Sequence, residues 1–356
     1  MTNTKNRIIW IDNMKAIGIF LVVLGHIVLK ERAVVSFIYS FHVPLFIFIS
    51  GLFFKNEDFS VLIKKNVKRL LIPYVCFYLL SYFWWIYFVF LRNSSNQYPD
   101  PSIYECVVKP IIGMLIEVIN TTEKSYFVNA ALWFLYSLFI VKIISFLILK
   151  IKNKVIMIIA IIAIPLLHIF MQQQHIFAYF TLPNTTSFFL FFILGYFLKD
   201  FFIKMPEFIH GYKAAILSLI LIIFQFIFAH YFYNKIYPTE SIIDYALFFI
   251  MGLSGIFCVF CICNILKKQN KIINYISANT LTILCVHIPI SGLILGGLKN
   301  IFGLNTSAVP LVIALCITFV SMSCSLVAAR FFHKYIPVII GEKKKSSSYP
   351  SGHSTV

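Results

Sequence analysis

The feature that most limits what this chain can fold into is a series of apolar stretches that recurs along its whole length. Each stretch is about 20 residues long, which is enough for an α-helix to cross about 30 Å of hydrocarbon. Of the 356 residues, 60% are hydrophobic, 12% are charged and 39 are phenylalanine. Water-soluble domains do not have this composition. The sequence therefore predicts an all-α fold, a polytopic transmembrane helical bundle.

The apolar stretches predict about ten helices. The sixth contains the polar run 181–187, which predicts a broken helix buried against protein or a cavity. A long outer segment, 92–129, has an apolar middle that is expected to lie on the membrane surface or to dip into it. The ten helices are expected near residues 13–30, 34–54, 70–91, 130–149, 155–170, 176–198, 214–233, 242–266, 276–294 and 309–332.

Positive charge is spread unevenly over the two sides of the predicted bundle. With both ends inside, 21 of the 30 Lys and Arg residues fall in cytoplasmic segments and seven fall outside. Because cytoplasmic loops carry an excess of Lys and Arg, both termini are expected to be cytoplasmic. The net charge of +17 then reflects topology and anionic lipid headgroups, so we expect membrane lipids and no nucleic acid as partners. We expect one transmembrane domain over residues 1–340 and a disordered cytoplasmic tail over 341–356.

The first predicted helix carries two ionisable groups, Lys15 and His26. Eleven residues at about 100° each bring them to within about 20° of one helical face, roughly 16 Å apart along the axis. An ionisable group inside a membrane is costly unless it faces a cavity or a partner, so it marks a candidate functional site. Imidazole is the side chain whose unperturbed pKa suits proton transfer near neutral pH. We expect a buried His26 to be neutral and able to accept a proton.

The other histidines and the cysteines give weaker signals. His168 and His230 are expected to be packing or hydrogen-bonding groups, the common role of a lone histidine in an apolar helix. His42 and His287 fit either a site or a hydrogen-bond partner. Seven of the eight cysteines fall in predicted spans, and the cluster at 258–263 is interpreted as packing, so no disulfide framework and no metal are expected.

Four stretches spread over nearly the whole chain resemble a known family. They are 11–26 (IDNMKAIGIFLVVLGH), 40–51 (SFHVPLFIFISG), 64–74 (KKNVKRLLIPY), and 132–135 (LWFL) together with 280–287 (TLTILCVH). The chain resembles the acyltransferase 3 family of integral membrane O-acyltransferases, and within it the fucose 4-O-acetylase-like branch. The first stretch is similar to the family's signature of a basic residue, ten further residues and a histidine.

Two positions depart from the family pattern. The basic residue of the first helix is most often arginine, whereas Lys15 keeps the charge and loses the planar bidentate fork. The cytoplasmic loop often reads Arg-x-x-Arg, whereas here it reads Asn66-Val-Lys-Arg69. The first arginine is therefore missing, although neighbouring lysines keep the loop strongly basic.

The resemblance implies an acyltransferase of the cell inner (plasma) membrane. Its acyl donor would be cytoplasmic acetyl-CoA, and its acceptor would be a hydroxyl of a cell-surface or lipid-linked glycan. His26 would activate that hydroxyl as a base, or would itself carry the acyl group. Lys15 and Asp12 would orient the donor or hold its charge at the cytoplasmic mouth.

Other residues receive roles by the same resemblance. Lys65, Lys68 and Arg69 are predicted to bind the phosphates of the cofactor, although the ordinary positive-inside pattern would produce the same residues. His42, Trp133 and His287 are predicted to bind substrate, and Trp133 could instead be an interfacial anchor.

A second class of function is a transporter or flippase that moves the glycan, or its lipid-linked precursor, without acyl transfer. Coupled carriers use acidic residues inside the membrane, and these are scarce here. Asp12 and Asp244 lie near the ends of predicted spans, and Glu117 lies in the outer segment. An acyltransferase that uses succinyl or another acyl group would differ only in the shape of its pocket.

Overall fold

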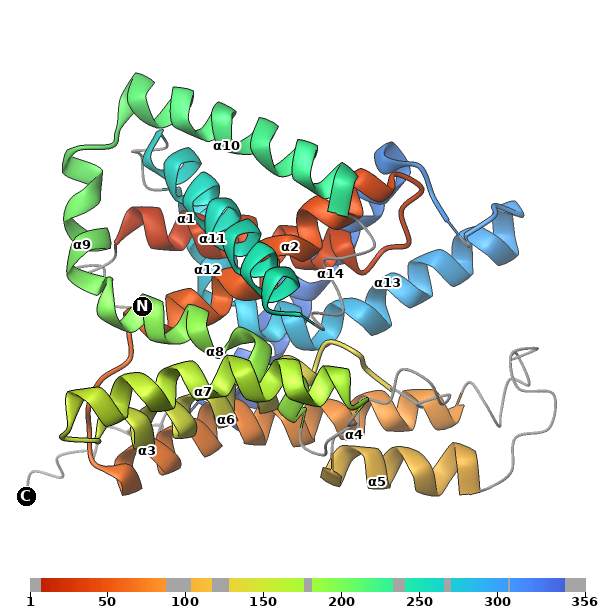
Figure 1. Cartoon of the computed structure of the whole chain (residues 1–356). Helices are drawn as coiled ribbons and strands as arrows, with labels where there is room; N and C mark the ends of the chain where they lie inside the picture. The colour runs from red at the N-terminus through yellow and green to blue at the C-terminus, as the bar shows by residue number, and fades with distance from the viewer. Residues whose placement is uncertain are drawn as a thin grey trace, which may run out of the picture.

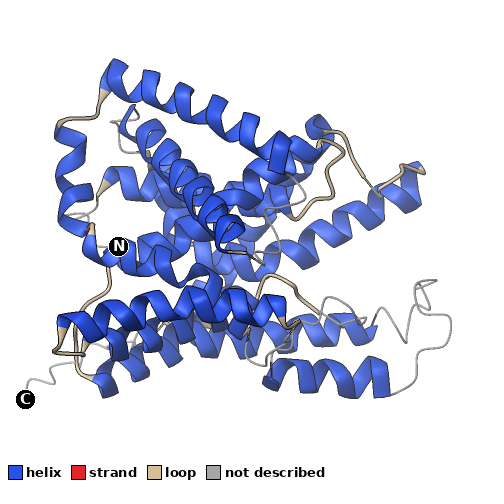
Figure 2. Ribbon diagram, viewed as in Figure 1, coloured by secondary structure: helices blue, strands red, loops and turns tan. Residues whose placement is uncertain are grey.

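The computed structural model describes residues 8–87, 104–116, 128–175, 181–232, 241–265, 270–306 and 308–342. In these ranges the chain forms helices and no strand, apart from one isolated parallel bridge between Leu29 and Val309 (Figures 1 and 2). The predicted all-α class is confirmed. Most of the predicted tail (343–356), much of the outer segment (92–103 and 117–127, with Glu117) and the side chain of His230 lie outside the described residues.

The helices follow one another along the chain, and the longest connections are residues 87–103 and 117–132. The π-helical turn η2 joins α3 to α4 without a gap, and α8 and α9 are separated by a single residue. In chain order the elements are α1 (Ile9–Gly25), α2 (Arg32–Leu52), α3 (Phe59–Asn66), η2 (Val67–Leu71), α4 (Ile72–Ile86), η4 (Tyr104–Val108), α5 (Lys109–Ile116), α6 (Trp133–Leu149), α7 (Lys154–Gln173), α8 (Leu182–Phe197), α9 (Lys199–Lys204), η5 (Met205–Glu207), α10 (Gly211–Phe232), α11 (Ile242–Ile265), α12 (Lys271–Ala278), α13 (Thr280–Phe302), α14 (Leu311–Tyr335) and η6 (Pro337–Ile340).

Several of these helices are long and apolar enough to cross a membrane. Within the described ranges there are seven, or eight if α8 and the bent α9–η5 segment form one span, and α6 is a shorter apolar helix. The polytopic membrane bundle predicted from the sequence is thus confirmed. Each of the ten predicted ranges overlaps a helix of the structure. The side of the membrane on which the termini lie stays a prediction.

Two predicted helices differ from the structure in a way that matters for the site. The first was expected at 13–30, but α1 ends at Gly25, so His26 follows the helix as its C-cap instead of lying deep within it. The sixth was expected to be broken by the polar run 181–187, but α8 begins at Leu182 and these residues form its first turns. The break comes later, where the chain bends by 62° between α8 and α9.

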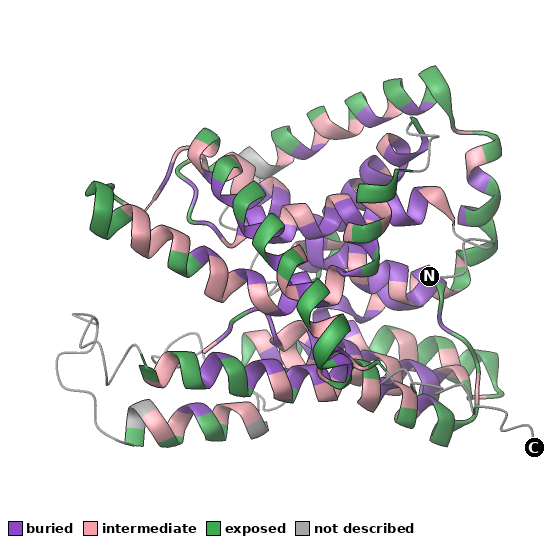
Figure 3. Cartoon of the chain, turned by 180° about the vertical axis from the view of Figure 1, so that it is seen from behind, coloured by how far each residue is buried: buried purple, intermediate pink, exposed green. Residues whose placement is uncertain are grey.

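The core lies where α2 and α11 cross the bundle. In an 18-residue apolar stretch of each of these helices 56% of the residues are buried, against 17% in α10 at the rim (Figure 3). The backbones of α2 and α8 approach closely at Gly51 and Gly195. A Cβ at Gly51 would collide with the carbonyl oxygen of Phe192, and one at Gly195 with that of Phe48. Only glycine permits this contact, which fixes α8 against α2.

A side-chain amide compensates for the proline inside α13. Pro289 lies inside α13 and has no N–H for the carbonyl of Cys285. The side-chain amide of Asn129 supplies the missing donor, at 2.8 Å from that oxygen. The structure therefore satisfies a backbone group that the proline leaves without a helical partner.

A row of tyrosines ties α5 to α4. Tyr74, Tyr78 and Tyr82 follow one another at intervals of four residues, and so lie on one face of α4. Their hydroxyls donate hydrogen bonds to three backbone carbonyls between Val107 and Met114, at 2.9, 2.7 and 3.1 Å. The apolar middle of the predicted outer segment is thus a short helix packed beside α4 (Figure 1).

Candidate active site

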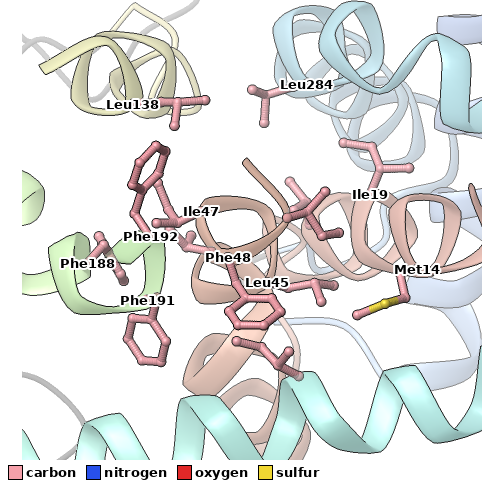
Figure 4. Close-up of a cluster of buried hydrophobic side chains, with 14 of the residues drawn as sticks. Met14, Ile19, Leu45, Ile47, Phe48, Leu138, Phe188, Phe191, Phe192 and Leu284 are labelled. Carbon is pink, nitrogen blue, oxygen red and sulfur yellow. The ribbon is translucent and has the colours of Figure 1, made fainter. Parts of the chain in front are cut away.

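A cavity of about 590 Å³ lies among α1, α2, α6, α8 and α13. Ile19 of α1, Leu138 of α6, Phe188 of α8 and Leu284 of α13 form part of its wall (Figure 4). Most of the wall is apolar, and the volume is that of a small-molecule binding site. The polar or ionisable side chains on the wall are Lys15, His26, Tyr39, His42, Ser50, Trp133, Asn184 and Thr280.

Lys15 and His26 both line this cavity, although they are eleven residues apart. The helical period places them on one face of α1, and at about 1.5 Å per residue they are roughly 16 Å apart along its axis. The cavity therefore follows α1 for most of its length. It carries an ammonium group toward one end of the helix and an imidazole at the other.

Three imidazoles near this cavity are held in the same way. His26, His42 and His287 each place Nδ1 close to the backbone carbonyl four residues earlier, at 2.8, 2.8 and 3.0 Å. A carbonyl oxygen can only accept, so we assign the hydrogen to Nδ1 in each ring. In the neutral ring Nε2 then keeps its lone pair. For His26 and His42, which line the cavity, Nε2 has no hydrogen-bond partner among the described residues.

His287 lies behind His26 and does not line the cavity. The two rings meet edge to face, with centroids 5.0 Å apart and planes at 71°. His287 is fully buried, and its Nε2 has no hydrogen-bond partner within the described part of the chain. The structure thus places this predicted substrate-binding residue next to the imidazole of His26 and away from the space in which a substrate would lie.

Tyr39 connects the two histidines of the cavity wall. Its hydroxyl donates to the carbonyl of Gly25 at 3.1 Å, which fixes the end of α1 beside α2. Its ring also meets that of His42 edge to face, with centroids 4.9 Å apart. Tyr39 was not identified from the sequence. Its spacing of three residues from His42 puts both on one face of α2, but no local signal shows that this face borders a cavity.

Asp12 lies on α1 one turn before Lys15, but it does not line the cavity. Its side chain is buried, and its Oδ1 accepts a hydrogen bond from the hydroxyl of Ser277 on α12. The carboxylate thus faces α12, which packs against α1. This places Asp12 where it fixes the position of α1 and so of Lys15.

The predicted cofactor-binding residues lie at the junction of α3 and η2, outside the cavity wall. The ammonium of Lys65 is 3.0 Å from a carboxylate oxygen of Glu57. Lys68 and Arg69 lie on η2 and make no ion pair within the described residues, and the next residue, Leu70, does line the cavity. The basic loop is therefore adjacent to the cavity. Turns of π-helix often occur at functional sites.

Lys142 of α6 also reaches this junction. Its ammonium donates to Oδ1 of Asn66 at 3.1 Å, and the amide of Asn66 donates to the carbonyl of Leu62 at 2.8 Å. The structure shows that Lys142 holds α6 against the end of α3.

Trp133 and Asn184 line the wall of the cavity that α6 and α8 provide. The indole of Trp133 stacks on the ring of Phe188, with centroids 5.9 Å apart and planes at 24°. Trp133 was predicted as a substrate-binding residue, whereas Asn184 was seen only as part of a polar interruption. In the described part of the chain, no three His, Cys, Asp or Glu side chains converge as metal ligands.

The fold and the cavity define a polytopic membrane protein with a lysine and two histidines on the wall of an internal cavity. The family model of an acyltransferase domain matches residues 8–330. Because this match covers most of the chain, the chain belongs to the acyltransferase 3 family and is a multi-pass membrane acyltransferase. Searches of curated proteins and of solved structures gave no match. The narrower resemblance to the fucose 4-O-acetylase-like branch stays a prediction.

Proposed function

We propose that this protein is an O-acetyltransferase of the inner membrane that moves an acetyl group from cytoplasmic acetyl-CoA to a hydroxyl of a cell-surface or lipid-linked glycan. The observation that carries the proposal is that Lys15, near the middle of α1, and His26, directly after its end, line one cavity. A donor and an acceptor that arrive from different sides of the membrane can meet in such a cavity. The acyltransferase class follows from the family, and the donor and acceptor are the proposed part.

His26 has the geometry of a general base. Its Nδ1 donates to the carbonyl of Val22 at 2.8 Å, so the neutral ring offers Nε2 to a proton. As the acceptor hydroxyl attacks the thioester carbonyl, its proton passes to Nε2 and a C–O bond forms. The C–S bond then breaks, and the proton on Nε2 passes to the leaving sulfur of CoA. The products are the acetyl ester and CoA with its thiol restored.

His26 could also carry the acetyl group itself. Nε2 would then attack the thioester, and the C–S bond would break to release CoA as a thiolate. In a second step the acceptor hydroxyl would take the acetyl group from the imidazole, and its proton would pass to the CoA thiolate. Incubation with labelled acetyl-CoA and no acceptor distinguishes the two routes. Label on the protein that is lost in His26→Gln supports a carrier, and its absence supports a base.

The other predicted site residues would bind or position the acetyl donor and the acceptor. Lys15 would face the thioester or the pantetheine arm, and Asp12 would position it from outside the cavity. Lys65, Lys68 and Arg69 would hold the phosphates of CoA, since charge-assisted contacts to phosphate are strong and the loop borders the cavity at Leu70. Trp133 and His42 would face the acceptor. His287 would act through the ring of His26, against which it packs.

Transfer of label separates this proposal from a flippase. Purified protein in liposomes is given [¹⁴C]acetyl-CoA on the outside or the inside, together with a glycan acceptor, and the label in the glycan is counted. Acetylated glycan is expected. Movement of the glycan across the bilayer without label in it would overturn the proposal. Parallel reactions with succinyl-CoA test the choice of acyl group.

A further inference from the structure

The wall of the cavity contains an amide that the acyl-transfer chemistry does not use. Asn184 lies in the first turn of α8 and lines the cavity together with Trp133. Its side chain is half-buried and makes no hydrogen bond within the described residues. A side-chain amide offers two donors and an acceptor, and in a largely apolar wall these groups need a partner.

The hydroxyls of the three residues that follow Asn184 have partners within the protein. The hydroxyl of Thr185 is 3.1 Å from that of Ser137 on α6. The hydroxyl of Thr186 donates to the carbonyl of Pro183 at 2.9 Å, and that of Ser187 donates to the carbonyl of Asn184 at 2.8 Å. Packing therefore explains the polar side chains at 185–187. The buried hydroxyl of Thr181 and the amide of Asn184 have no partner among the described residues, and of these two residues Asn184 lines the cavity.

The backbone that carries Asn184 is fixed from several sides. His168 of α7 donates from Nδ1 to the carbonyl of Pro183 at 3.0 Å, and the hydroxyl of Tyr245 on α11 donates to the carbonyl of Ser187 at 3.0 Å. Thr181, directly before α8, has φ of 49°, a left-handed conformation that is costly for a β-branched residue. Such strain at a buried position is retained where the surrounding structure determines it, and functional sites are the usual place.

The chemistry of this wall fits a sugar ring. Trp133 and Phe188 form an aromatic pair on the cavity wall, and Phe188 lies one turn after Asn184 on the same helix. Aromatic faces pack against the C–H faces of a pyranose, while an amide can donate to one hydroxyl and accept from the next. An extended acyl chain would use the apolar wall and leave the amide without a partner.

We propose that Asn184, beside Trp133, binds hydroxyls of the acceptor sugar next to the one that is acylated, and so decides which hydroxyl faces His26. This inference rests on the proposed acyl transfer. Asn184 is a specificity-determining residue for the acceptor and takes no part in the transfer of protons or of the acetyl group. Its contacts are made with the acceptor alone.

Kinetics of Asn184→Leu test the inference, because leucine keeps the volume and removes the amide. The probes are [¹⁴C]acetyl-CoA and the methyl glycosides of glucose, galactose and fucose, together with their monodeoxy forms. The loss of hydrogen bonds to a neutral amide is expected to raise KM for the best acceptor about 3- to 10-fold. KM for acetyl-CoA and the slow hydrolysis of acetyl-CoA without acceptor are expected to be unchanged. The product is expected to be acetylated at more than one hydroxyl, which NMR of the purified ester detects.

The deoxy sugars and a control variant separate recognition from damage to the fold. The wild-type protein is expected to lose activity on one monodeoxy acceptor, and Asn184→Leu is expected to show no further loss on it. Ser187→Ala removes a hydroxyl one turn away that bonds only to its own helix and does not line the cavity, and it is expected to behave as wild type. Wild-type transfer with an unchanged acceptor KM and a single product in Asn184→Leu would overturn this inference alone. Absence of transfer to every glycoside by the wild-type protein would overturn the proposed glycan acceptor as well.

Discussion

The ring of His287 packs edge to face against the ring of His26, with centroids 5.0 Å apart. His287 lies on α13 and His26 directly follows α1, and of the two only His26 lines the cavity. His287 is fully buried with Nε2 unpaired in the described structure, which costs about 1–3 kcal/mol for a polar group without a partner. A position that tolerates such a cost is a good place to test whether the second imidazole matters for chemistry or for packing.

His287→Phe keeps an aromatic ring against His26 and removes the unpaired nitrogen. The variant also loses the hydrogen bonds from Nδ1 to the carbonyls of Ile283 and Leu284, but both carbonyls keep their N–H partners within α13. We therefore expect the thermal unfolding temperature in detergent to stay the same or rise, since the unpaired Nε2 is removed. Acetyl transfer is expected to fall less than about 10-fold, because the residue acts only through the position of His26. A fall as large as that of a His26 variant, in a protein of normal stability, would show that His287 touches the reacting groups.

The close contact of α2 and α8 predicts a stability effect at Gly51. In Gly51→Ala the new Cβ would meet the backbone carbonyl of Phe192, which cannot move aside as a side chain could. Overpacking of this kind costs about 1–3 kcal/mol. The unfolding temperature of Gly51→Ala is expected to fall, and the same is expected for Gly195→Ala.

A second glycine provides the control for this measurement. A Cβ at Gly292, inside α13, would have no neighbour within 4 Å. Gly292→Ala is expected to leave stability unchanged or to raise it by up to about 1 kcal/mol through helix propensity. Equal unfolding temperatures for the variants at positions 51 and 292 would contradict the proposed contact between the two backbones.

Asn129 is predicted to stabilise α13 at its proline. Asn129→Ala leaves the buried carbonyl of Cys285 without its 2.8 Å donor, because Pro289 has no N–H to offer. The expected loss is about 1–3 kcal/mol, measured as a lower unfolding temperature. In a Pro289→Ala background the backbone N–H is restored, so Asn129→Ala should then cost less, and the remaining cost is that of its hydrogen bonds with Ser81 and the N–H of Ala131. An equal cost in both backgrounds would show that the proline is not the reason for the contact.

The basic turn η2 is predicted to bind the phosphates of the acyl donor. Lys68→Gln with Arg69→Gln removes two cations that make no ion pair in the described structure. If they contact phosphate, KM for acetyl-CoA should rise at least about 10-fold, the result of losing charge-assisted hydrogen bonds. KM for the acceptor should not change.

The control for η2 is a pair of cations from another segment predicted to be cytoplasmic. Lys199→Gln with Lys204→Gln, on α9, changes the net charge by the same amount and is expected to leave KM for acetyl-CoA unchanged. If the two pairs of substitutions change KM for acetyl-CoA equally, or if neither changes it, Lys68 and Arg69 do not bind the donor. They are then explained by the excess of positive charge in cytoplasmic segments.

Local patterns in the sequence predicted the parts of the site that depend on one helix. The shared face of Lys15 and His26 follows from the helical period alone, and both line the cavity. Asn184 and Tyr39 were missed because their orientation depends on how α8 and α2 pack. That packing is set by a pair of glycines and by contacts between distant residues, which no short stretch of sequence shows.

Some helix ends could not be predicted for a related reason. Hydropathy places an apolar segment in the membrane but does not fix where its hydrogen bonds stop. Thus α1 ends at Gly25, where the carbonyl accepts from Tyr39, and the polar start of α8 is stabilised by Ser137 and His168 from neighbouring helices. Residues 182–187 are helical because their hydroxyls find partners within α8 and across the bundle, and residues 176–180 of the predicted sixth helix lie outside the described residues.

The most direct test of the central claim is the rate of acetyl transfer by His26→Gln, measured with [¹⁴C]acetyl-CoA and acceptor in liposomes. Glutamine keeps a polar side chain of similar reach but cannot accept a proton near neutral pH, so kcat should fall at least about 100-fold with the unfolding temperature unchanged. His168→Gln, at a buried histidine outside the cavity, should stay within about three-fold of wild type, because its amide can still donate to the carbonyl of Pro183. Wild-type rates in a correctly inserted His26→Gln protein would contradict the account.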